Sequence, residues 1–332
     1  MEHFLGAPEA SVVARVRETT STSLDDELGI LDIPLDARNE ILSHWSTFLT
    51  EEAWVRRLAQ LVTMVERDRG NNLALLPIWD DLDDHGTSGR LLYYYVFAMA
   101  APGLRRMLRD QGAPDDLVSE TCSLLARHGE IHRQKWGSVG VDAGWWLLPV
   151  LRGEIVQVGS LEFHRTPLGH GILACEPWYD EAQQQELGEG FRYGDESLGL
   201  HIPAFIDLSP EAVDETFARA RRVLGVLWPC SQSRLMTLES WMMDDRLAAA
   251  LGPESRIVQF QQRFTFLPTW HDDRDNVLEF VFRQPLVPFE ELRPQSRLQS
   301  FILETLKRVT GTAVWGGSIS TDQNHAARAR AQ

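Results

Sequence analysis

The segment from Trp145 to Arg165 separates two parts of the chain that have different hydrophobic patterns. Before it, apolar side chains recur every three or four residues; after it, many stretches alternate apolar and polar side chains. The first spacing is that of a helix and the second that of a β-strand. We therefore expect an α+β protein, in which an N-terminal helical bundle is followed by a mixed β-sheet flanked by helices.

This change of pattern predicts a helical domain over residues 1–140 and a second domain over residues 141–332. The expected helices of the first domain cover residues 36–48, 50–68, 88–109 and 114–136. The third is apolar nearly all round between Leu91 and Phe97, which is typical of the buried helix of a bundle. Residues 79–85 form an acidic stretch, expected to be a surface loop rather than a cation site.

The second domain mixes strands and helices, an order that is typical of a central sheet with helices packed on it. The expected strands cover residues 154–165, 168–176, 197–204, 234–241, 256–267 and 276–283. The expected helices cover residues 210–224, 242–251 and 297–309, and residues 319–332 form a polar tail. Ser209 and Pro210 are typical of the N-cap and first position of the helix that follows them.

Charge and cysteine content exclude several classes of function. The formal net charge is −16, which disfavours general nucleic-acid binding because phosphate backbones are repelled. No apolar run reaches the ~20 residues that a membrane-spanning helix needs, and the N-terminus lacks a signal-peptide pattern. The three cysteines are few and widely spaced, so we expect a reducing cytoplasm.

A histidine pair and a cysteine are possible reactive groups, but the sequence supports neither strongly. His128 and His132 share a helical face, but Gly129 stands where the zinc-protease signature has glutamate, and basic residues crowd the segment. We therefore expect no metal site. Cys175 would need a nearby base to act as a nucleophile, so a structural cysteine is the expected interpretation.

The strand expected over residues 154–165 carries the first candidate chemistry. Glu162 and His164 lie two positions apart on its polar face, roughly 7 Å along the strand. A carboxylate and an imidazole at this separation form a possible acid/base pair. His201 stands close to Pro203 at the end of another expected strand, where ligands of open sheets usually bind.

Several segments, taken in order, resemble a known family. They are Gly89–Phe97, Pro114–Asp116, Trp145–Leu147 with Arg152-Gly153, Gly159–Arg165, Leu200–Pro203, Ser240–Asp244 and Ile257–Phe264. The chain resembles the GNAT acyltransferase superfamily. More narrowly, it is similar to bacterial acyltransferase-domain proteins that join a helical N-acyltransferase N-terminal domain to a GNAT-like C-terminal domain.

The resemblance implies an N-acyltransferase that moves an acyl or aminoacyl group from an activated thioester or ester donor. The donor is expected to be acyl-CoA, a carrier-bound acyl group or an aminoacyl-tRNA, and the acceptor a small amine or amino-acid-like molecule. Acyl transfer to an amine needs a base, a group that polarises the carbonyl, and an acid for the leaving group. The candidate catalytic residues are His201, Glu162, His164 and Glu239, and the candidate substrate-binding residues are Ser240, Trp241, Trp145 and Trp146.

Four of these residues also have a structural interpretation. His201 is then a histidine that bonds a loop backbone, and Trp241 a core side chain. Glu162 and His164 are then partners of arginines such as Arg165 or Arg192.

The chain departs from the superfamily where coenzyme A is expected. GNAT enzymes bind its pyrophosphate with a glycine-containing loop, whereas residues 204–212 of this chain contain no glycine. The free amides of a helix N-terminus attract anions, but Asp207 and Glu211 would oppose them. The missing loop favours a second hypothesis, a catalytically silent GNAT-like binding or partner protein.

Overall fold

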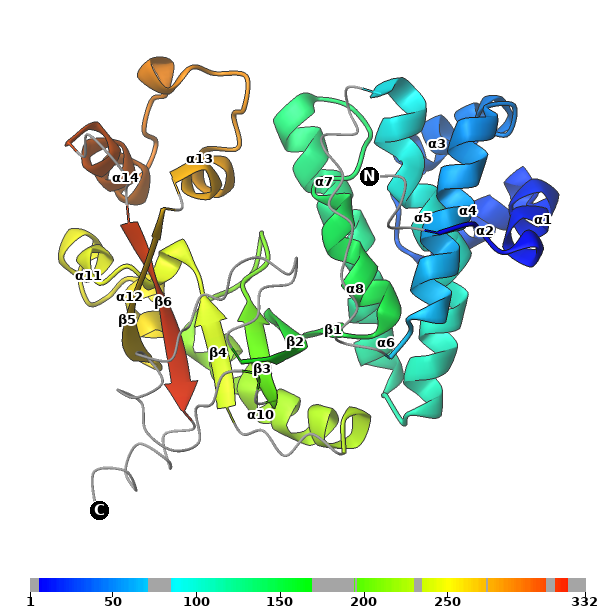
Figure 1. Cartoon of the computed structure of the whole chain (residues 1–332). Helices are drawn as coiled ribbons and strands as arrows, with labels where there is room; N and C mark the ends of the chain where they lie inside the picture. Colours follow the sequence, from blue (N-terminus) through cyan, green and yellow to red (C-terminus); the bar gives the residue numbers. More distant parts are fainter. Residues whose placement is uncertain are drawn as a thin grey trace. The chain divides into compact units, whose positions relative to one another are not determined.

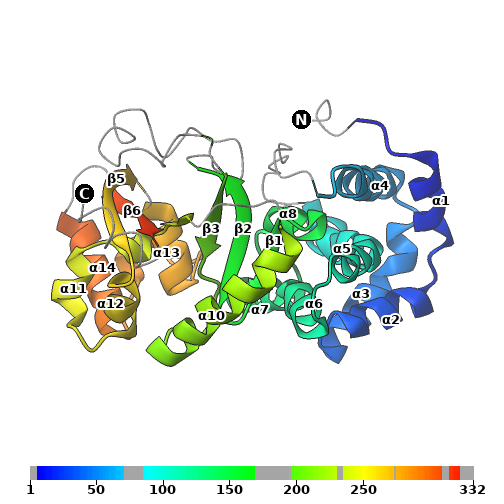
Figure 2. The same cartoon turned by 90° about the horizontal axis from the view of Figure 1, so that it is seen from below.

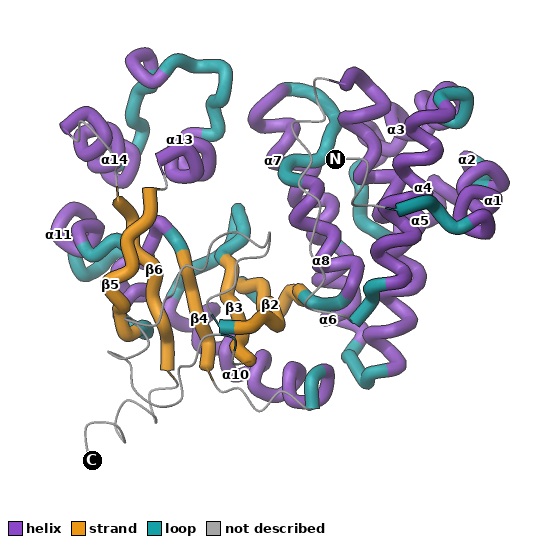
Figure 3. The backbone as a smooth tube through the Cα atoms, viewed as in Figure 1, coloured by secondary structure: helices purple, strands orange, loops and turns teal. Residues whose placement is uncertain are grey.

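The computed structural model describes residues 6–70, 85–168, 194, 196–229, 235–272, 274–308 and 314–321. The fold is α+β, with a helical N-terminal region followed by a mixed sheet with flanking helices (Figure 3). The chain divides into two compact units near Gly159, with Arg222–Pro229 belonging to the first. The domain boundary expected at residue 140 stays a prediction. No helix of the described chain has the length and apolar character needed to cross a membrane.

The first unit is a bundle of helices (Figure 1). They are α1 (Ala10–Glu18), α2 (Ser21–Ile30), α3 (Leu35–Phe48), α4 (Glu52–Arg67), α5 (Gly86–Asp110), α6 (Asp115–Cys122), α7 (Leu124–Trp136), the 3-10 turn η2 (Gly144–Trp146) and α8 (Leu147–Arg152). Every residue from Leu91 to Ala98 of α5 is buried, as its uniformly apolar sequence predicted. This helix forms the core of the bundle.

The helix expected over residues 114–136 is two helices, α6 and α7, which meet at Ser123. The Ser123 hydroxyl donates to the Glu120 carbonyl oxygen at 2.8 Å. A serine side chain that bonds a nearby backbone carbonyl competes with continuous helical bonding. Apolar periodicity alone does not reveal such a break. The single long helix was therefore wrong.

The second region contains a six-stranded mixed sheet in the order β1-β2-β3-β4-β6-β5. The strands are β1 (Ile155–Val158), β2 (Leu161–Pro167), β3 (Glu196–His201), β4 (Leu235–Glu239), β5 (Thr265–Asp272) and β6 (Val314–Thr321). Strands β2 and β3 are antiparallel, β3 and β4 are parallel, and β6 runs antiparallel to both β4 and β5. The helices of this region are α10 (Pro210–Leu227), α11 (Arg246–Leu251), α12 (Arg256–Gln261), α13 (Arg274–Phe282) and α14 (Arg297–Arg308), with 3-10 turns η3 (Trp241–Met243) and η4 (Phe289–Glu291).

A tight turn divides the strand expected over residues 154–165 into β1 and β2. Gly159, at the turn, has a φ of +57°, a left-handed conformation that side chains with a Cβ disfavour. Thr216 of α10 holds the turn, because its Oγ1 accepts a hydrogen bond from the Ser160 amide at 3.0 Å. The segment is extended as expected, but it reverses direction at Gly159.

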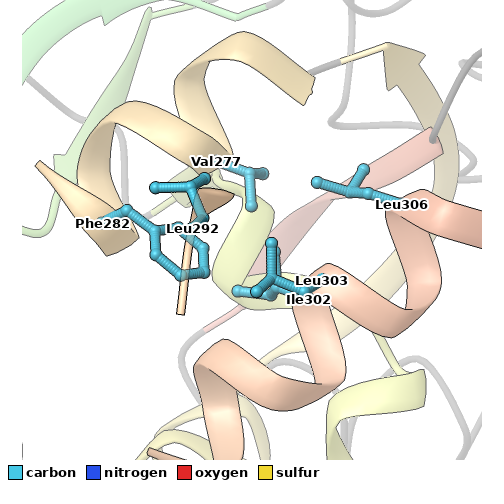
Figure 4. Close-up of a cluster of buried hydrophobic side chains, with 6 residues drawn as sticks. All are labelled: Val277, Phe282, Leu292, Ile302, Leu303 and Leu306. Carbon is cyan, nitrogen blue, oxygen red and sulfur yellow. The ribbon is translucent and has the colours of Figure 1, made fainter. Parts of the chain in front are cut away.

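Two of the expected strands are helical over most or half of their length. Residues 256–261 form α12 before β5 begins, and the strand expected over residues 276–283 lies mostly in α13. Apolar residues in α13 stand at both strand-like and helix-like spacings, so packing decides the outcome. Val277 and Phe282 of α13 join Leu292 and the α14 residues Ile302, Leu303 and Leu306 in one buried cluster (Figure 4).

The remaining helices of the second region and the C-terminal segment can be compared with their expected bounds. The helix expected over residues 210–224 is α10, and that over residues 297–309 is α14. The helix expected over residues 242–251 is the turn η3 followed by α11. The tail expected from residue 319 was wrong in part, because residues 319–321 end β6. Residues 79–84 of the acidic stretch, and residues 169–176 of one expected strand, lie outside the described residues.

We predict that Gly159→Ala destabilises the protein by about 1–2 kcal/mol from the left-handed backbone alone. The new Cβ would also lie 2.5 Å from Thr216 Oγ1, which disrupts the bond to Ser160. Gly225→Ala is the matched control, because Gly225 lies in α10 with open space around its Cβ position. That change is expected to stabilise the protein by up to about 1 kcal/mol. Urea denaturation measures both, and equal effects would contradict the analysis of the turn.

Candidate active site

The pairing of β2 with β3 brings three candidate catalytic residues together. Glu162 is the direct cross-strand partner of His201, and His164 is opposite Gly199. Opposed residues of an antiparallel pair, and residues two apart in a strand, share one face. The rings of His164 and His201 accordingly lie with centroids 5.6 Å apart. One carboxylate and two imidazoles therefore gather on one face of the sheet.

Hydrophobic packing on the other face fixes this arrangement. Leu161 and Phe163 of β2 are fully buried, and Phe163 meets Phe217 of α10 edge-on with ring centroids 6.4 Å apart. Figure 2 shows α10 running along the β2–β3 part of the sheet. Because alternate residues of β2 point to opposite faces, Glu162 and His164 project away from α10.

Two of these polar side chains are shielded from water. Glu162 and His164 are 2% and 4% exposed. Burial lowers the pKa of His201 to about 3, so its imidazole is neutral at physiological pH. A neutral imidazole has a lone pair that accepts a proton or a hydrogen bond, but it does not act as an imidazolium acid. The electrostatics therefore favour His201 as a base rather than as an acid.

Gly199 was missed as a site residue by the sequence interpretation. A Cβ added to Gly199 would lie 3.2 Å from Thr166 Cγ2 and 3.6 Å from His164 Cβ, so any larger residue crowds the polar face. A glycine inside a strand is a sequence signal of such close approach. Pairing of β3 with β4 covers only Leu198–Met236 and Gly199–Thr237, and His201 lies beyond it.

Arginine pairing was the structural alternative for Glu162 and His164. Arg165 donates from Nε to Glu196 Oε1 at 2.8 Å, so the structure gives Arg165 a different acidic partner. Arg192 lies outside the described residues. Glu239 is the last residue of β4 and pairs through its backbone with Gly317 of β6.

Ser240 and Trp241 have structural contacts of their own. The Ser240 hydroxyl accepts a hydrogen bond from the Met242 amide at 3.2 Å and so caps η3. Trp241 packs against the buried cluster shown in Figure 4. Gln261 fixes the following residues, since its side-chain amide donates to the carbonyls of Met242 and Asp244 at 2.6 and 2.8 Å. Substrate binding by Ser240 and Trp241 stays a prediction.

Trp145 and Trp146 belong to the helical unit, where they form η2. Their rings meet edge-on with centroids 5.8 Å apart, and both side chains are half-buried. This leaves part of each indole open to solvent. Their role in substrate binding also stays a prediction.

The loop before α10, residues 204–209, repels anions less than its sequence indicates. Asp207 accepts hydrogen bonds from the amide and hydroxyl of Ser209, at 2.9 and 2.8 Å. These bonds, together with Arg256 at 2.9 Å, lower the pKa of Asp207. Its charge is therefore partly compensated within the protein.

The histidine pair that suggested a metal motif contacts the backbone. His128 Nδ1 lies 2.6 Å from the Asp142 carbonyl oxygen, and His132 Nδ1 lies 3.0 Å from that of Ser138. Both rings thereby fasten the loop after α7. Within the described ranges, no three histidine, cysteine or acidic side chains come together as metal ligands.

Comparison with known proteins assigns the chain to a family. Residues 22–153 match the N-acyltransferase N-terminal domain, and residues 155–319 match the GNAT-like C-terminal domain. The chain therefore belongs to the family that joins these two domains, as its sequence motifs predicted, and it is a GNAT-like acyltransferase.

Solved structures agree with this assignment. An acyltransferase in complex with decanoyl-CoA and teicoplanin is 26% identical, with a TM-score of 0.75, over 95% of this chain and 91% of that chain. A mutant acyltransferase in complex with octanoyl-CoA is 25% identical, with a TM-score of 0.77, over 95% of this chain and 90% of that chain. No curated protein matches the chain.

We predict that His201 makes the protein sensitive to acid. Its pKa is about 3 in the folded state and about 6.5 when unfolded, so between these values the unfolded chain binds more protons. The stability contribution of neutral His201 is complete above pH 6.5 and is lost as the pH falls towards 3. At pH 5 the loss is about 2 kcal/mol.

Urea denaturation of the native protein and of His201→Asn, at pH 7.5 and pH 5, measures this loss. The difference in unfolding free energy between the two proteins should change by that amount, because asparagine does not titrate. A pH-independent difference would show that His201 keeps an ordinary pKa.

Proposed function

We propose that the chain transfers an acyl group from acyl-CoA to the amine of a small or amino-acid-like acceptor. The observation that carries this proposal is the grouping of Glu162, His164 and His201 on one face of the sheet. The similar solved acyltransferases contain decanoyl-CoA or octanoyl-CoA, and one also contains teicoplanin. These ligands belong to those proteins and support the donor class proposed for this one.

The proposed reaction begins with attack of the neutral amine on the thioester carbonyl carbon. A carbon–nitrogen bond forms, the carbon–sulfur bond breaks, one proton leaves the nitrogen, and the thiolate takes up one proton. His201, neutral at physiological pH, is the proposed base for the proton on nitrogen. The Glu162 carboxylate lies across the strand pair from it and would stabilise the imidazolium that forms.

His164 is proposed to position this pair. Its ring lies beside His201 and its backbone partner is Gly199, which leaves room on the sheet face. A base held by packed neighbours loses little freedom when it meets the substrate, and such positioning contributes substantially to catalysis.

Acyl-CoA is preferred over the other two donors considered, a carrier-bound acyl group and an aminoacyl-tRNA. The net charge of −16 opposes a polyanionic tRNA. The N-terminus of α10, whose first turn contains Glu211, follows β3 directly and offers amides to a phosphate group. Compensation of Asp207 by Ser209 and Arg256 reduces the repulsion there.

We predict that His201→Asn lowers kcat for acyl transfer by roughly 10²-fold or more, the usual contribution of a positioned base. Release of the CoA thiol from decanoyl-CoA in the presence of an amine measures turnover. His132→Asn is the matched control, because His132 is a buried histidine whose Nδ1 contacts the Ser138 carbonyl oxygen. The control is expected to lower the melting temperature and keep the turnover of the folded fraction. Full turnover by His201→Asn would remove His201 from the mechanism.

We also predict that Asp207→Asn lowers the KM for acyl-CoA by about threefold at low salt, since exposed charge interactions are small. Asparagine keeps an oxygen that accepts the hydrogen bond from the Ser209 amide. It removes the negative charge that pairs with Arg256, so the guanidinium becomes available to a phosphate group. The same change should have no effect in 1 M salt, where charges are screened. An unchanged KM at low salt would place the phosphates of the donor elsewhere.

A further inference from the structure

Three consecutive tyrosines of α5 differ in how their hydroxyls are bonded. The Tyr94 hydroxyl donates to the Gly140 carbonyl at 3.1 Å, and the Tyr95 hydroxyl donates to the Ile41 carbonyl at 2.9 Å. The Tyr93 side chain is equally buried, at 5% exposure, yet its hydroxyl has no hydrogen-bond partner among the described residues. A buried hydroxyl without a partner costs free energy that phenylalanine would not. A ligand that accepts a hydrogen bond from the hydroxyl would remove this cost.

The backbone at Gly144 packs closely against the Tyr93 ring, and two tryptophans follow Gly144 in the chain. A Cβ on Gly144 would lie 2.1 Å from Tyr93 Cδ2, so the backbone lies directly against the tyrosine ring. Trp145 and Trp146 follow at once, with half-buried indoles packed edge-on. This part of the helical unit combines a buried hydroxyl with partly open aromatic surface, which suits a ring or another apolar body.

Positive charge acts on the same hydroxyl. Burial raises the pKa of Tyr93, so the hydroxyl stays protonated and donates, while Arg57 of α4 favours its ionised form. The Arg57 guanidinium lies 5.6 Å from the ring centroid of Trp54, which itself meets His85 edge-on. A hydrogen-bond donor with a nearby cation is the arrangement that recognises an anionic oxygen.

We propose that Tyr93, Arg57, Trp145 and Trp146 form a binding subsite in the helical unit for a carboxylate joined to an aromatic or apolar body. The Tyr93 hydroxyl donates to the carboxylate, Arg57 supplies the opposite charge, and the indoles contact the apolar body. That this ligand is the amino-acid-like acceptor rests on the proposed function. The subsite itself rests on the contacts of Tyr93, Gly144 and Arg57.

Calorimetric titration of the full chain without donor tests the subsite, with phenylalanine and phenylalaninamide as probes. The two probes share the ring and the amine and differ in the carboxylate. The native protein is expected to bind phenylalanine at least tenfold more tightly. Tyr93→Phe should weaken phenylalanine binding about tenfold, as for a hydrogen bond to a charged group, and leave the amide unaffected. Trp145→Ala should weaken both probes.

Tyr95→Phe is the matched control, because its hydroxyl bonds the protein. It should lower the melting temperature and keep the affinity for phenylalanine, whereas Tyr93→Phe should keep or raise the melting temperature. Equal affinity for the two probes, binding of neither, displacement by inorganic phosphate, or native-like binding by Tyr93→Phe would each overturn the carboxylate subsite.

Acyl-transfer assays separate this subsite from the proposed function. Transfer to simple amines, combined with equal affinity for the two probes, would retain the function and reject the subsite. Selective phenylalanine binding by a protein that acylates no amine would retain the subsite and reject the function.

Discussion

The antiparallel register of β2 and β3 is the constraint on which the candidate active site depends. It places Glu162 opposite His201, with His164 beside both. A slip of one residue would turn the polar side chains of β2 towards α10 and Phe163 to the other face. The packing of Phe163 on Phe217, and the bond from the Ser160 amide to Thr216, oppose such a slip. Apolar contacts on one face therefore hold the arrangement of the candidate residues on the other.

Burial also decides the charge states of ionisable side chains. His201 loses its affinity for protons because water is removed from around it. Glu154 follows the same principle in the helical unit, where burial raises its pKa to about 7 although Arg152 donates to it at 2.8 Å. Desolvation thus outweighs an ion pair of good geometry, as is often found for buried pairs. A neutral imidazole at His201 suits a base that receives a proton only during the reaction.

The sequence predicted those parts of the fold that local pattern controls. The apolar centre of α5, the extended backbone on either side of Gly159, and the capped start of α10 each follow from side chains close together in the chain, whereas the turn at Gly159 was not predicted. The strands expected around residues 256 and 276 failed because their apolar residues fit either period. For residues 276–283, packing of α13 against α14 selects the helix, and that packing joins segments that are separate in sequence.

The sequence by itself determined the chemical types at the candidate site, namely a carboxylate and two imidazoles at strand positions, and the motifs that mark the family. The tertiary structure decided which of them meet: Glu162, His164 and His201 do, because β3 pairs with β2 in one register. It also decided that Trp241 packs on a core and that Tyr93 differs from Tyr94 and Tyr95. Hydrogen-bond partners and burial depend on segments far apart in the chain, so no local pattern encodes them.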